Sequence, residues 1–130
     1  MKAYLIEPQT IFVPYLRGML ARAGFDVVAT SQGVDSRDIL AHDPAAIFID
    51  IDYLERSGPT ALCRIREATQ TAAVIALSET TDALFAATCT ISGATQLCSK
   101  ADGEEQLMRT LRTVARAKDA RPERAAAASR

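Results

Sequence analysis

The chain has 130 residues, of which 48% are apolar, enough for one domain with a single sizeable core. Lysine and arginine number 15 against 16 aspartate and glutamate, and the net charge of -1 argues against the broad basic surface of proteins that bind nucleic acid or anionic membranes. No apolar run has the length of a membrane span, and the N-terminus lacks the features of a signal peptide, so we expect a cytoplasmic protein.

Apolar runs of strand length alternate with helical patterns along the chain. The first strand is expected at about 2–7. A helical pattern follows with Pro14 inside it, and because a proline in a helix interior costs about 3 kcal/mol, we expect the regular helix to begin near Val13 or to kink at the proline. A second strand is expected at 25–30, followed by a short, weakly periodic helix at 33–41.

The most apolar run, 45–51, is expected to be the central strand, buried on both faces. After a loop at 53–58, Pro59 can open a third helix. The pattern then predicts a strand, a helix and a further strand, at 72–78, 81–92 and 94–99.

The last helix is expected to begin after Asp102, because Asp102 and Glu105 have the spacing of a capping box. Pro122 is expected to end it, which makes residues 119–130 a flexible tail behind one domain at 1–118. Strand and helix therefore alternate five times, with connections too long for hairpins. This pattern predicts an α/β fold with a five-stranded, doubly wound parallel sheet covered by helices on both faces.

Four of the expected strands end in polar side chains. Glu7 ends the first strand and Asp50 the third, while Ser78 and Lys100 end the fourth and fifth. In a parallel sheet these ends share one edge, where open α/β folds bind their ligands, so the four groups can converge. Two acids, a hydroxyl and an ammonium suit a phosphoryl group or a divalent cation.

These residues, with Gly58 eight positions after Asp50, resemble the receiver domain of two-component response regulators over about residues 2–118. The resemblance implies a flavodoxin-like fold and a role in phosphorelay signal transduction. Asp50 matches the phosphoacceptor, a carboxylate that takes a phosphoryl group from a phosphohistidine. Ser78 matches the hydroxyl that binds one phosphoryl oxygen, and Lys100 matches the ammonium that pairs with another.

The same resemblance implies a Mg²⁺ ion, weakly held. Glu7 matches the first of two acids that hold the ion, Asp50 is a ligand itself, and the main-chain carbonyl of Asp52 falls at a third ligand position. Pro8 stands where the second acid is expected, so one ligand is missing and the affinity for the cation should be reduced. The side chain of Asp52 could compensate; otherwise it is interpreted as a solvated loop acid.

Three further positions depart from the pattern of that family. Glu79 follows Ser78 where a small residue is usual, so a bulky acid can hinder or repel an incoming phosphoryl group. Ala101 replaces the proline that usually follows Lys100 through a cis bond, and because a non-proline cis bond costs about 3 to 4 kcal/mol, we expect a trans peptide. Leu97 stands where an aromatic ring commonly swings inward on activation, which compromises the usual coupling.

The resemblance also implies partners. A histidine kinase or phosphotransfer protein would donate the phosphoryl group, and the fourth helix, fifth strand and fifth helix would contact a downstream protein or a second copy of the chain. We expect a single-domain, atypical receiver whose phosphorylation at Asp50 is impaired, with no enzymatic activity beyond slow loss of the phosphoryl group. Neither nucleic acid nor a membrane is an expected partner.

Two alternatives remain open. One is a degenerate receiver that acts as an interaction module independent of phosphorylation. The other is a phosphatase of the haloacid dehalogenase class, suggested by Asp50 and Asp52 and disfavoured because that class usually carries its Asp-x-Asp pair on the first strand. Lys100 could also serve only as an ion-pair partner of Asp50.

Simpler structural roles account for the remaining conspicuous residues. His42 is interpreted as compensating the dipole at the C-terminus of a helix. Three cysteines lie within apolar or helical patterns and are interpreted as buried free thiols: Cys63, Cys89 and Cys98.

Overall fold

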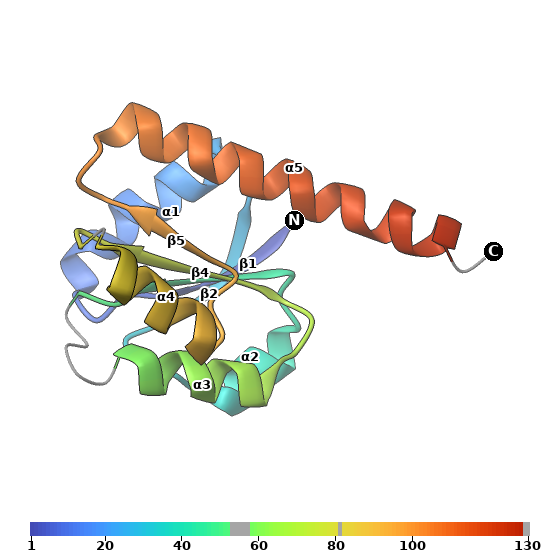
Figure 1. Ribbon diagram of the computed structural model, residues 1–130, viewed down its shortest axis with the longest axis horizontal. Coiled ribbons are helices and arrows are strands. Elements are labelled where there is room, and N and C mark those ends of the chain that lie inside the picture. The colour runs from blue at the N-terminus through green and yellow to red at the C-terminus, as the bar shows by residue number, and fades with distance from the viewer. Residues whose placement is uncertain (53–57, 81, 129–130) are drawn as a thin grey trace.

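The computed structural model describes residues 1–52, 58–80 and 82–128, with side chains described as far as residue 117. In this part of the chain five parallel strands form one sheet in the order β2-β1-β3-β4-β5 (Figure 1). The strands are β1 (Lys2–Ile6), β2 (Asp26–Ser31), β3 (Ala46–Asp50), β4 (Ala73–Ser78) and β5 (Gln96–Ser99). This is the flavodoxin-like order, so the predicted α/β fold is confirmed.

Helices cover both faces of the sheet, as expected of a doubly wound fold. They are the short 3₁₀ helix η1 (Thr10–Phe12) and the α-helices α1 (Val13–Arg22), α2 (Ser36–His42), α3 (Gly58–Ala68), α4 (Ala83–Ser92) and α5 (Glu104–Ala128). Figure 1 shows α1 and α5 on one face and α2, α3 and α4 on the other. The strands are therefore buried between two helical layers.

Alternating side chains of the central strand β3 divide the interior into two cores. Ala46 and Phe48 pack with residues of α1 and α5, whereas Ile47 and Ile49 pack with residues of α2, α3 and α4. All residues of β3 are buried, which confirms the expectation that this run forms the central strand. With both faces covered, β3 holds its last residue, Asp50, in a fixed position at the end of the sheet.

The helix α1 begins where the proline permits. Pro14 lies within its first turn, directly after η1. Because the first N–H groups of a helix have no intrahelical acceptor, the missing N–H of proline costs little there. The expectation that the regular helix begins near Val13 is confirmed, and Phe12 remains 42% exposed beside the end of β3.

The start of α4 is fixed by a side chain. The Oδ1 atom of Asp82 accepts hydrogen bonds from the backbone N–H groups of Leu84 (2.8 Å) and Phe85 (3.2 Å), so Asp82 is the N-cap. The predicted start at Thr81 lies outside the described residues. The predicted loop at 53–58 does so as well, except for Gly58, which begins α3.

Two expectations about α5 are wrong. The backbone N–H of Leu107 donates to the carbonyl of Gly103, so Gly103 caps the helix and Asp102 lies one residue before it. The chain turns into α5 through a φ of 90° at Gly103, which glycine adopts without strain. The helix also continues past Pro122 to Ala128, because a proline deletes one backbone hydrogen bond whereas the surrounding alanine, arginine and glutamate residues favour helix. Flexibility of the tail stays a prediction.

Of the remaining structural expectations, those for Cys89, Cys98 and His42 are confirmed and the one for Cys63 is wrong. Cys89 and Cys98 are buried as predicted, but Cys63 is exposed because it lies on the outer side of α3. His42 is the last residue of α2, as expected, and its Nδ1 atom lies 2.9 Å from the carbonyl oxygen of Asp38. Among the described residues, no helix combines the length and the apolar character that crossing a membrane requires.

Candidate functional site

The carboxyl ends of four strands bring the predicted site residues to one edge of the sheet. Glu7 follows β1, Asp50 ends β3, Ser78 ends β4 and Lys100 follows β5. The first three are almost completely enclosed, with exposed fractions of 0%, 3% and 0%, and they are the polar residues buried among the described ones. Because buried carboxyl groups need partners, the contacts at this edge determine which protonation states the site can adopt.

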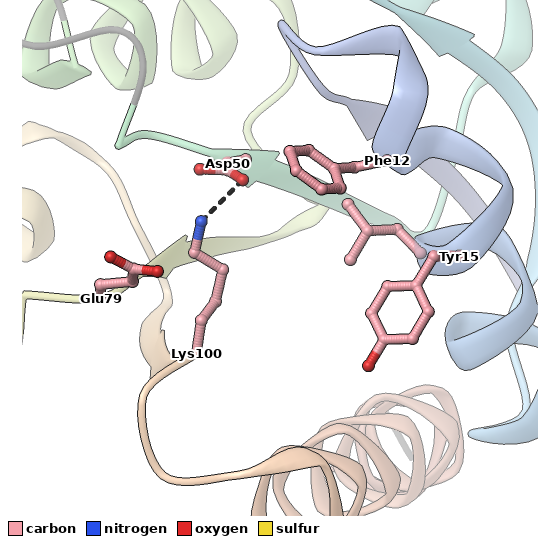
Figure 2. Close-up of a pocket in the computed structure, with 6 residues that line it drawn as sticks. Phe12, Tyr15, Asp50, Glu79 and Lys100 are labelled. Atoms are coloured by element: carbon pink, nitrogen blue, oxygen red, sulfur yellow. Dashed lines mark hydrogen bonds and ion pairs between the residues drawn. The ribbon is translucent and has the colours of Figure 1, made fainter.

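Asp50 and Lys100 form an ion pair across the end of the sheet. The Nζ atom of Lys100 lies 2.8 Å from Oδ2 of Asp50, and the two side chains point toward each other in Figure 2. The other oxygen, Oδ1, accepts a hydrogen bond from the backbone N–H of Asp52 at 3.1 Å. No cis peptide bond occurs in the described part of the chain, so the expected trans bond between Lys100 and Ala101 is confirmed.

Lys100 holds a second carboxylate as well. Its Nζ atom lies 2.6 Å from Oδ2 of Asp52. Burial alone would lower the pKa of Lys100, but hydrogen bonds to Asp50 and Asp52 outweigh it and the pKa is raised. The ammonium group therefore stays charged and neutralises part of the negative charge at the strand ends.

The side chain of Asp52 is not the solvated loop acid that the sequence suggested. Its Oδ1 atom accepts a 2.6 Å hydrogen bond from the hydroxyl of Ser78, and the backbone N–H of Glu79 donates to Oδ1 at 3.2 Å and to Oδ2 at 3.0 Å. Burial acts to raise the pKa of Asp52, but the bonds from Lys100, Ser78 and Glu79 outweigh it and lower that pKa. Asp52 is thus held as an ionised carboxylate within the site.

A signal for this position was present in the sequence. Ile51 still donates its backbone N–H to Leu77, so the extended path of β3 continues past Asp50. With the two-residue period of extended chain, residues 50 and 52 lie on the same side. The two-residue spacing of Asp50 and Asp52 was therefore a hint that their carboxyl groups lie on one side, although it did not predict the donors that Asp52 binds.

Glu7 contributes a buried carboxyl group with one free oxygen. Its Oε1 atom accepts a hydrogen bond from the backbone N–H of Gln9 at 3.0 Å, whereas Oε2 is buried and has no hydrogen-bond partner among the described residues. Burial, followed by interaction with Asp50, raises the pKa of Glu7 to about 7. Binding of a proton or a cation would offset the unfavourable burial of this carboxylate.

The donor set fits a divalent cation only in part. The free Oε2 atom of Glu7 and the neighbouring carboxylate of Asp50 are hard oxygen ligands of the kind that Mg²⁺ prefers. The described residues contain no group of three or more acidic, histidine or cysteine side chains arranged around a metal site, and Pro8 adds no side-chain oxygen. Two carboxylates could hold the ion, with water completing its shell.

A pocket of about 180 Å³ opens beside the ion pair of Asp50 and Lys100. Figure 2 shows Phe12 and Tyr15 on the side opposite Lys100, with Glu79 beside the lysine. The aromatic lining was not predicted, since it depends on how α1 packs against the sheet. The pocket gives a ligand access to the phosphoacceptor candidate from the solvent.

The remaining predicted positions surround the site without entering the ion-pair cluster. Leu97 is partly buried and packs against the core formed with α2, α3 and α4. Ala101 is exposed, and its backbone N–H donates to the hydroxyl of Ser99 at 3.1 Å. Pro8 is half-buried directly after Glu7.

The family model for the response regulator receiver domain matches residues 4–112, most of the chain. The chain belongs to the response regulator receiver domain family. The resemblance drawn from the strand-end residues is thereby confirmed, and the alternative assignment to the haloacid dehalogenase class is wrong. A comparison with curated proteins found no match.

Solved structures of other receivers share the fold at low sequence identity. A chain of the CheX-CheY-BeF3-Mg complex from Borrelia burgdorferi is 18% identical, with a TM-score of 0.73 and 88% of each chain covered. The isolated receiver domain of RcsB from Salmonella enterica, in the presence of the phosphomimetic BeF3, is 15% identical, with a TM-score of 0.71 and coverage of 89% of this chain and 88% of that one. A response regulator from Burkholderia pseudomallei with a phosphorylated aspartic acid is 20% identical, with a TM-score of 0.69 and coverage of 93% and 72%.

Membership of the family establishes the general role. Receiver domains are generally non-enzymatic signalling modules that interact with histidine kinases or phosphotransfer proteins, and they typically bind Mg²⁺ at their acidic pocket. The buried acids and the paired lysine of this receiver lie where such a pocket is expected.

Proposed function

We propose that this receiver accepts a phosphoryl group at Asp50 and passes the signal on by protein contact, with phosphorylation weaker than in receivers that have a complete acidic pocket. The observation that carries the proposal is the 2.8 Å contact between Lys100 and Asp50 at the mouth of a solvent-accessible pocket. The carboxylate of Asp50 can act as a nucleophile, and the ammonium group beside it partly neutralises the negative charge that would repel a phosphoryl donor.

The chemical step needs only the phosphohistidine donor and a proton from solvent. A carboxylate oxygen of Asp50 attacks the phosphorus atom of a phosphohistidine, forming a P–O bond as the P–N bond breaks. The imidazole nitrogen leaves with the bonding electron pair and takes a proton from solvent. Lys100 already lies within hydrogen-bonding distance of Asp50, so its ammonium group can pair with a phosphoryl oxygen that arrives there.

Glu7 and Asp50 are the residues that would hold Mg²⁺. When bound, a divalent cation neutralises negative charge as the phosphoryl group approaches the carboxylates. The buried, unpartnered Oε2 atom of Glu7 supports a cation at this position. The main-chain carbonyl of Asp52 remains the proposed third ligand.

Three observations support impaired phosphorylation. Pro8 supplies no second acid beside Glu7, so cation binding loses one ligand. Glu79 places an exposed acid at the pocket that the donor must enter. The carboxylate of Asp52 occupies donors that a phosphoryl group would use. The first feature weakens binding of the neutralising cation, and the other two repel an incoming dianionic group or occupy its donors.

Mass spectrometry after incubation with acetyl phosphate and millimolar Mg²⁺ tests the proposal. We expect slow, incomplete addition of one phosphoryl group to the wild type, located at Asp50, and none to Asp50→Asn. Phosphorylation of Asp50→Asn to the same extent would exclude Asp50 as the acceptor. Rapid and complete modification of the wild type would exclude impairment.

The surface of α4 supports output by protein contact. This helix contains no charged residue over Ala83–Ser92, and Leu84 and Ile91 are 78% and 87% exposed. Exposed apolar side chains on an uncharged helix favour association, either with a downstream protein or with a second copy of the chain. Light scattering of the purified protein distinguishes the two. If α4 binds a second copy of the chain, the wild type should form a dimer that Leu84→Glu and Ile91→Glu abolish; if it binds a downstream protein, the wild type and both variants should be monomers.

A degenerate receiver that acts without phosphate is the second candidate. The same exposed α4 side chains favour it, because they are displayed in the unmodified structure and need no phosphoryl group to become accessible. If acetyl phosphate leaves the wild type unmodified while the mutations in α4 abolish association, this second function replaces the first.

A further inference from the structure

The carboxylate of Asp52 is bound by three donors from two other strand ends. The hydroxyl of Ser78 donates to Oδ1 at 2.6 Å, Lys100 contacts Oδ2 at 2.6 Å, and the backbone N–H of Glu79 donates to both oxygens. Ser78 and Lys100 are the two groups proposed to bind phosphoryl oxygens. A compact anion is therefore already seated on the phosphoryl donors, and it belongs to the chain itself.

We propose that Asp52 is an internal occupant of the phosphoryl site, whose carboxylate must leave Ser78, Glu79 and Lys100 before a tetrahedral oxyanion can bind there. This inference rests on the proposed function for the identity of the competing anion. It makes Asp52 a residue that sets the affinity of the site for phosphoryl groups, and it treats the self-occupied arrangement as the resting state of the receiver.

The competition follows from the number of protons that the donors carry. A serine hydroxyl has one proton and a backbone amide has one, so neither can make full hydrogen bonds to two anions at once. The hydroxyl oxygen of Ser78 also accepts from the backbone N–H of Thr80 at 3.0 Å, which fixes the orientation in which its own proton points to Asp52. A phosphoryl oxygen can take the proton only when Asp52 releases it.

Charge acts in the same direction as hydrogen bonding. Asp52 donates its backbone N–H to Oδ1 of Asp50, which keeps the occupying residue next to the proposed phosphoacceptor. A phosphoryl group on Asp50 would bring additional negative charge beside the carboxylate of Asp52, at a place where burial weakens screening. Removing that carboxylate removes both the competitor and the repulsion.

Binding of inorganic sulfate tests the inference without requiring any phosphorylation. The test compares Asp50→Asn, which lacks the nucleophile, with the double variant Asp50→Asn/Asp52→Ala, at constant ionic strength. The reporter is the backbone amide of Glu79 in ¹⁵N–¹H NMR spectra. We expect a saturable shift of this amide in the double variant, with an affinity at least about tenfold above that of Asp50→Asn, because three charge-assisted donors become available.

Matched controls separate this effect from a change in net charge or folding. Asp26 is exposed at the start of β2, far along the sheet from the site, so Asp50→Asn/Asp26→Ala changes the charge equally and should bind sulfate no better than Asp50→Asn. Asp52→Asn replaces Asp52→Ala if the latter does not give a dispersed spectrum. Equal sulfate affinity with and without the Asp52 carboxylate in folded variants overturns the inference.

A second arm keeps Asp50 intact and separates failure of the inference from failure of the proposed function. With acetyl phosphate and Mg²⁺, Asp52→Ala should be phosphorylated about tenfold faster than the wild type, whereas Asp26→Ala should match the wild type. Sulfate binding without phosphorylation would refute the phosphoacceptor role and leave Asp52 as an occupant of an anion site. Phosphorylation that is unchanged by Asp52→Ala, together with no sulfate binding, would refute the role of Asp52 as an occupant and leave Asp50 as the phosphoacceptor.

Discussion

The hydroxyl of Ser78 and the Oδ1 atom of Asp52 lie 2.6 Å apart, joined by a hydrogen bond between the end of β4 and the residue two positions beyond β3. This bond, together with the ion pair between Lys100 and Asp50, ties three strand ends into one polar cluster. The cluster lies at the carboxyl edge of the sheet, beside the pocket that residues of α1 line, so changes to its charges should alter both ligand binding and stability.

Replacing Lys100 by methionine should destabilise the receiver by about 2 kcal/mol, because it leaves the carboxylates of Asp50 and Asp52 without their cation. Urea unfolding at pH 7.5 without divalent ions measures the change. Lys2→Met is the control, since Lys2 is exposed at the opposite end of β1 and its loss should cost less than about 0.5 kcal/mol. Equal effects of the two substitutions would contradict the energetic role of Lys100.

Replacing Glu7 by glutamine should abolish stabilisation by Mg²⁺. Glu7 supplies the free, buried carboxyl oxygen, whereas glutamine keeps the size of the side chain and removes the charge that binds the cation. Thermal unfolding with and without millimolar Mg²⁺ should show a rise in Tm for the wild type and none for Glu7→Gln.

The control for Glu7 is an exposed acid. Glu67 lies on the outer side of α3, so Glu67→Gln should retain the Mg²⁺-dependent rise of the wild type. Without Mg²⁺, Glu7→Gln should be more stable than the wild type by about 1 kcal/mol, because it no longer buries a carboxyl group that can ionise beside Asp50. An unchanged Mg²⁺ response in Glu7→Gln would remove Glu7 from the cation site.

Replacing Arg66 by lysine should destabilise the receiver by about 2 kcal/mol. The guanidinium group donates to the carbonyls of Ala72 and Gly93, each at 2.7 Å, and to the hydroxyl of Thr95 at 2.9 Å. A lysine ammonium group cannot reach all three acceptors in the same geometry, so buried carbonyl groups lose their partners. Chemical denaturation measures the loss.

Arg64→Lys, on the same helix, is the matched control for Arg66. Arg64 is exposed and makes one hydrogen bond, to the carbonyl of Val34 at 3.2 Å, so its replacement should cost less than about 0.5 kcal/mol. Gly93 should tolerate no larger residue, because a Cβ atom there would collide with the Cγ atom of Arg66 and its φ of 125° favours glycine. Similar losses for the two arginine variants would show that the three-acceptor contact is not energetically important.

Replacing Tyr4 by phenylalanine should cost about 1 kcal/mol at neutral pH, with a loss that disappears in strong alkali. Burial, followed by the 2.6 Å hydrogen bond to Asp38, raises the pKa of Tyr4 from 10.0 to about 12. A raised pKa in the folded state means that the tyrosine stabilises the fold below its unfolded pKa of 10.0, and that this contribution is lost as the pH rises to about 12.

The measurement for Tyr4 is the free energy of unfolding of the wild type and Tyr4→Phe across that pH range. The difference between the two should be constant up to about pH 10 and should shrink between pH 10 and about pH 12. A difference that does not change with pH would show that the pKa of Tyr4 is the same in the folded and unfolded states, and would contradict this prediction.

Local patterns in the sequence were sufficient to predict the fold and the positions of the four strand-end groups. Apolar runs of strand length separated by helical patterns define the parallel sheet, and the strand-end positions of Glu7, Asp50, Ser78 and Lys100 then follow, because parallel strands end at a common edge. Pro14 was also placed correctly, since the first turn of a helix is where a missing N–H costs least. These features depend on local periodicity and backbone chemistry, which the sequence contains directly.

The contacts of Asp52 depend on tertiary packing. A residue just past a strand end can point to solvent or inward, and the choice depends on donors from β4 and β5 that lie far away in the sequence. The aromatic lining from Phe12 and Tyr15 likewise depends on how α1 packs, and the path of α5 past Pro122 on a balance of small helix propensities. Such outcomes are set by contacts between distant segments, whose energies are comparable to the local preferences that they override.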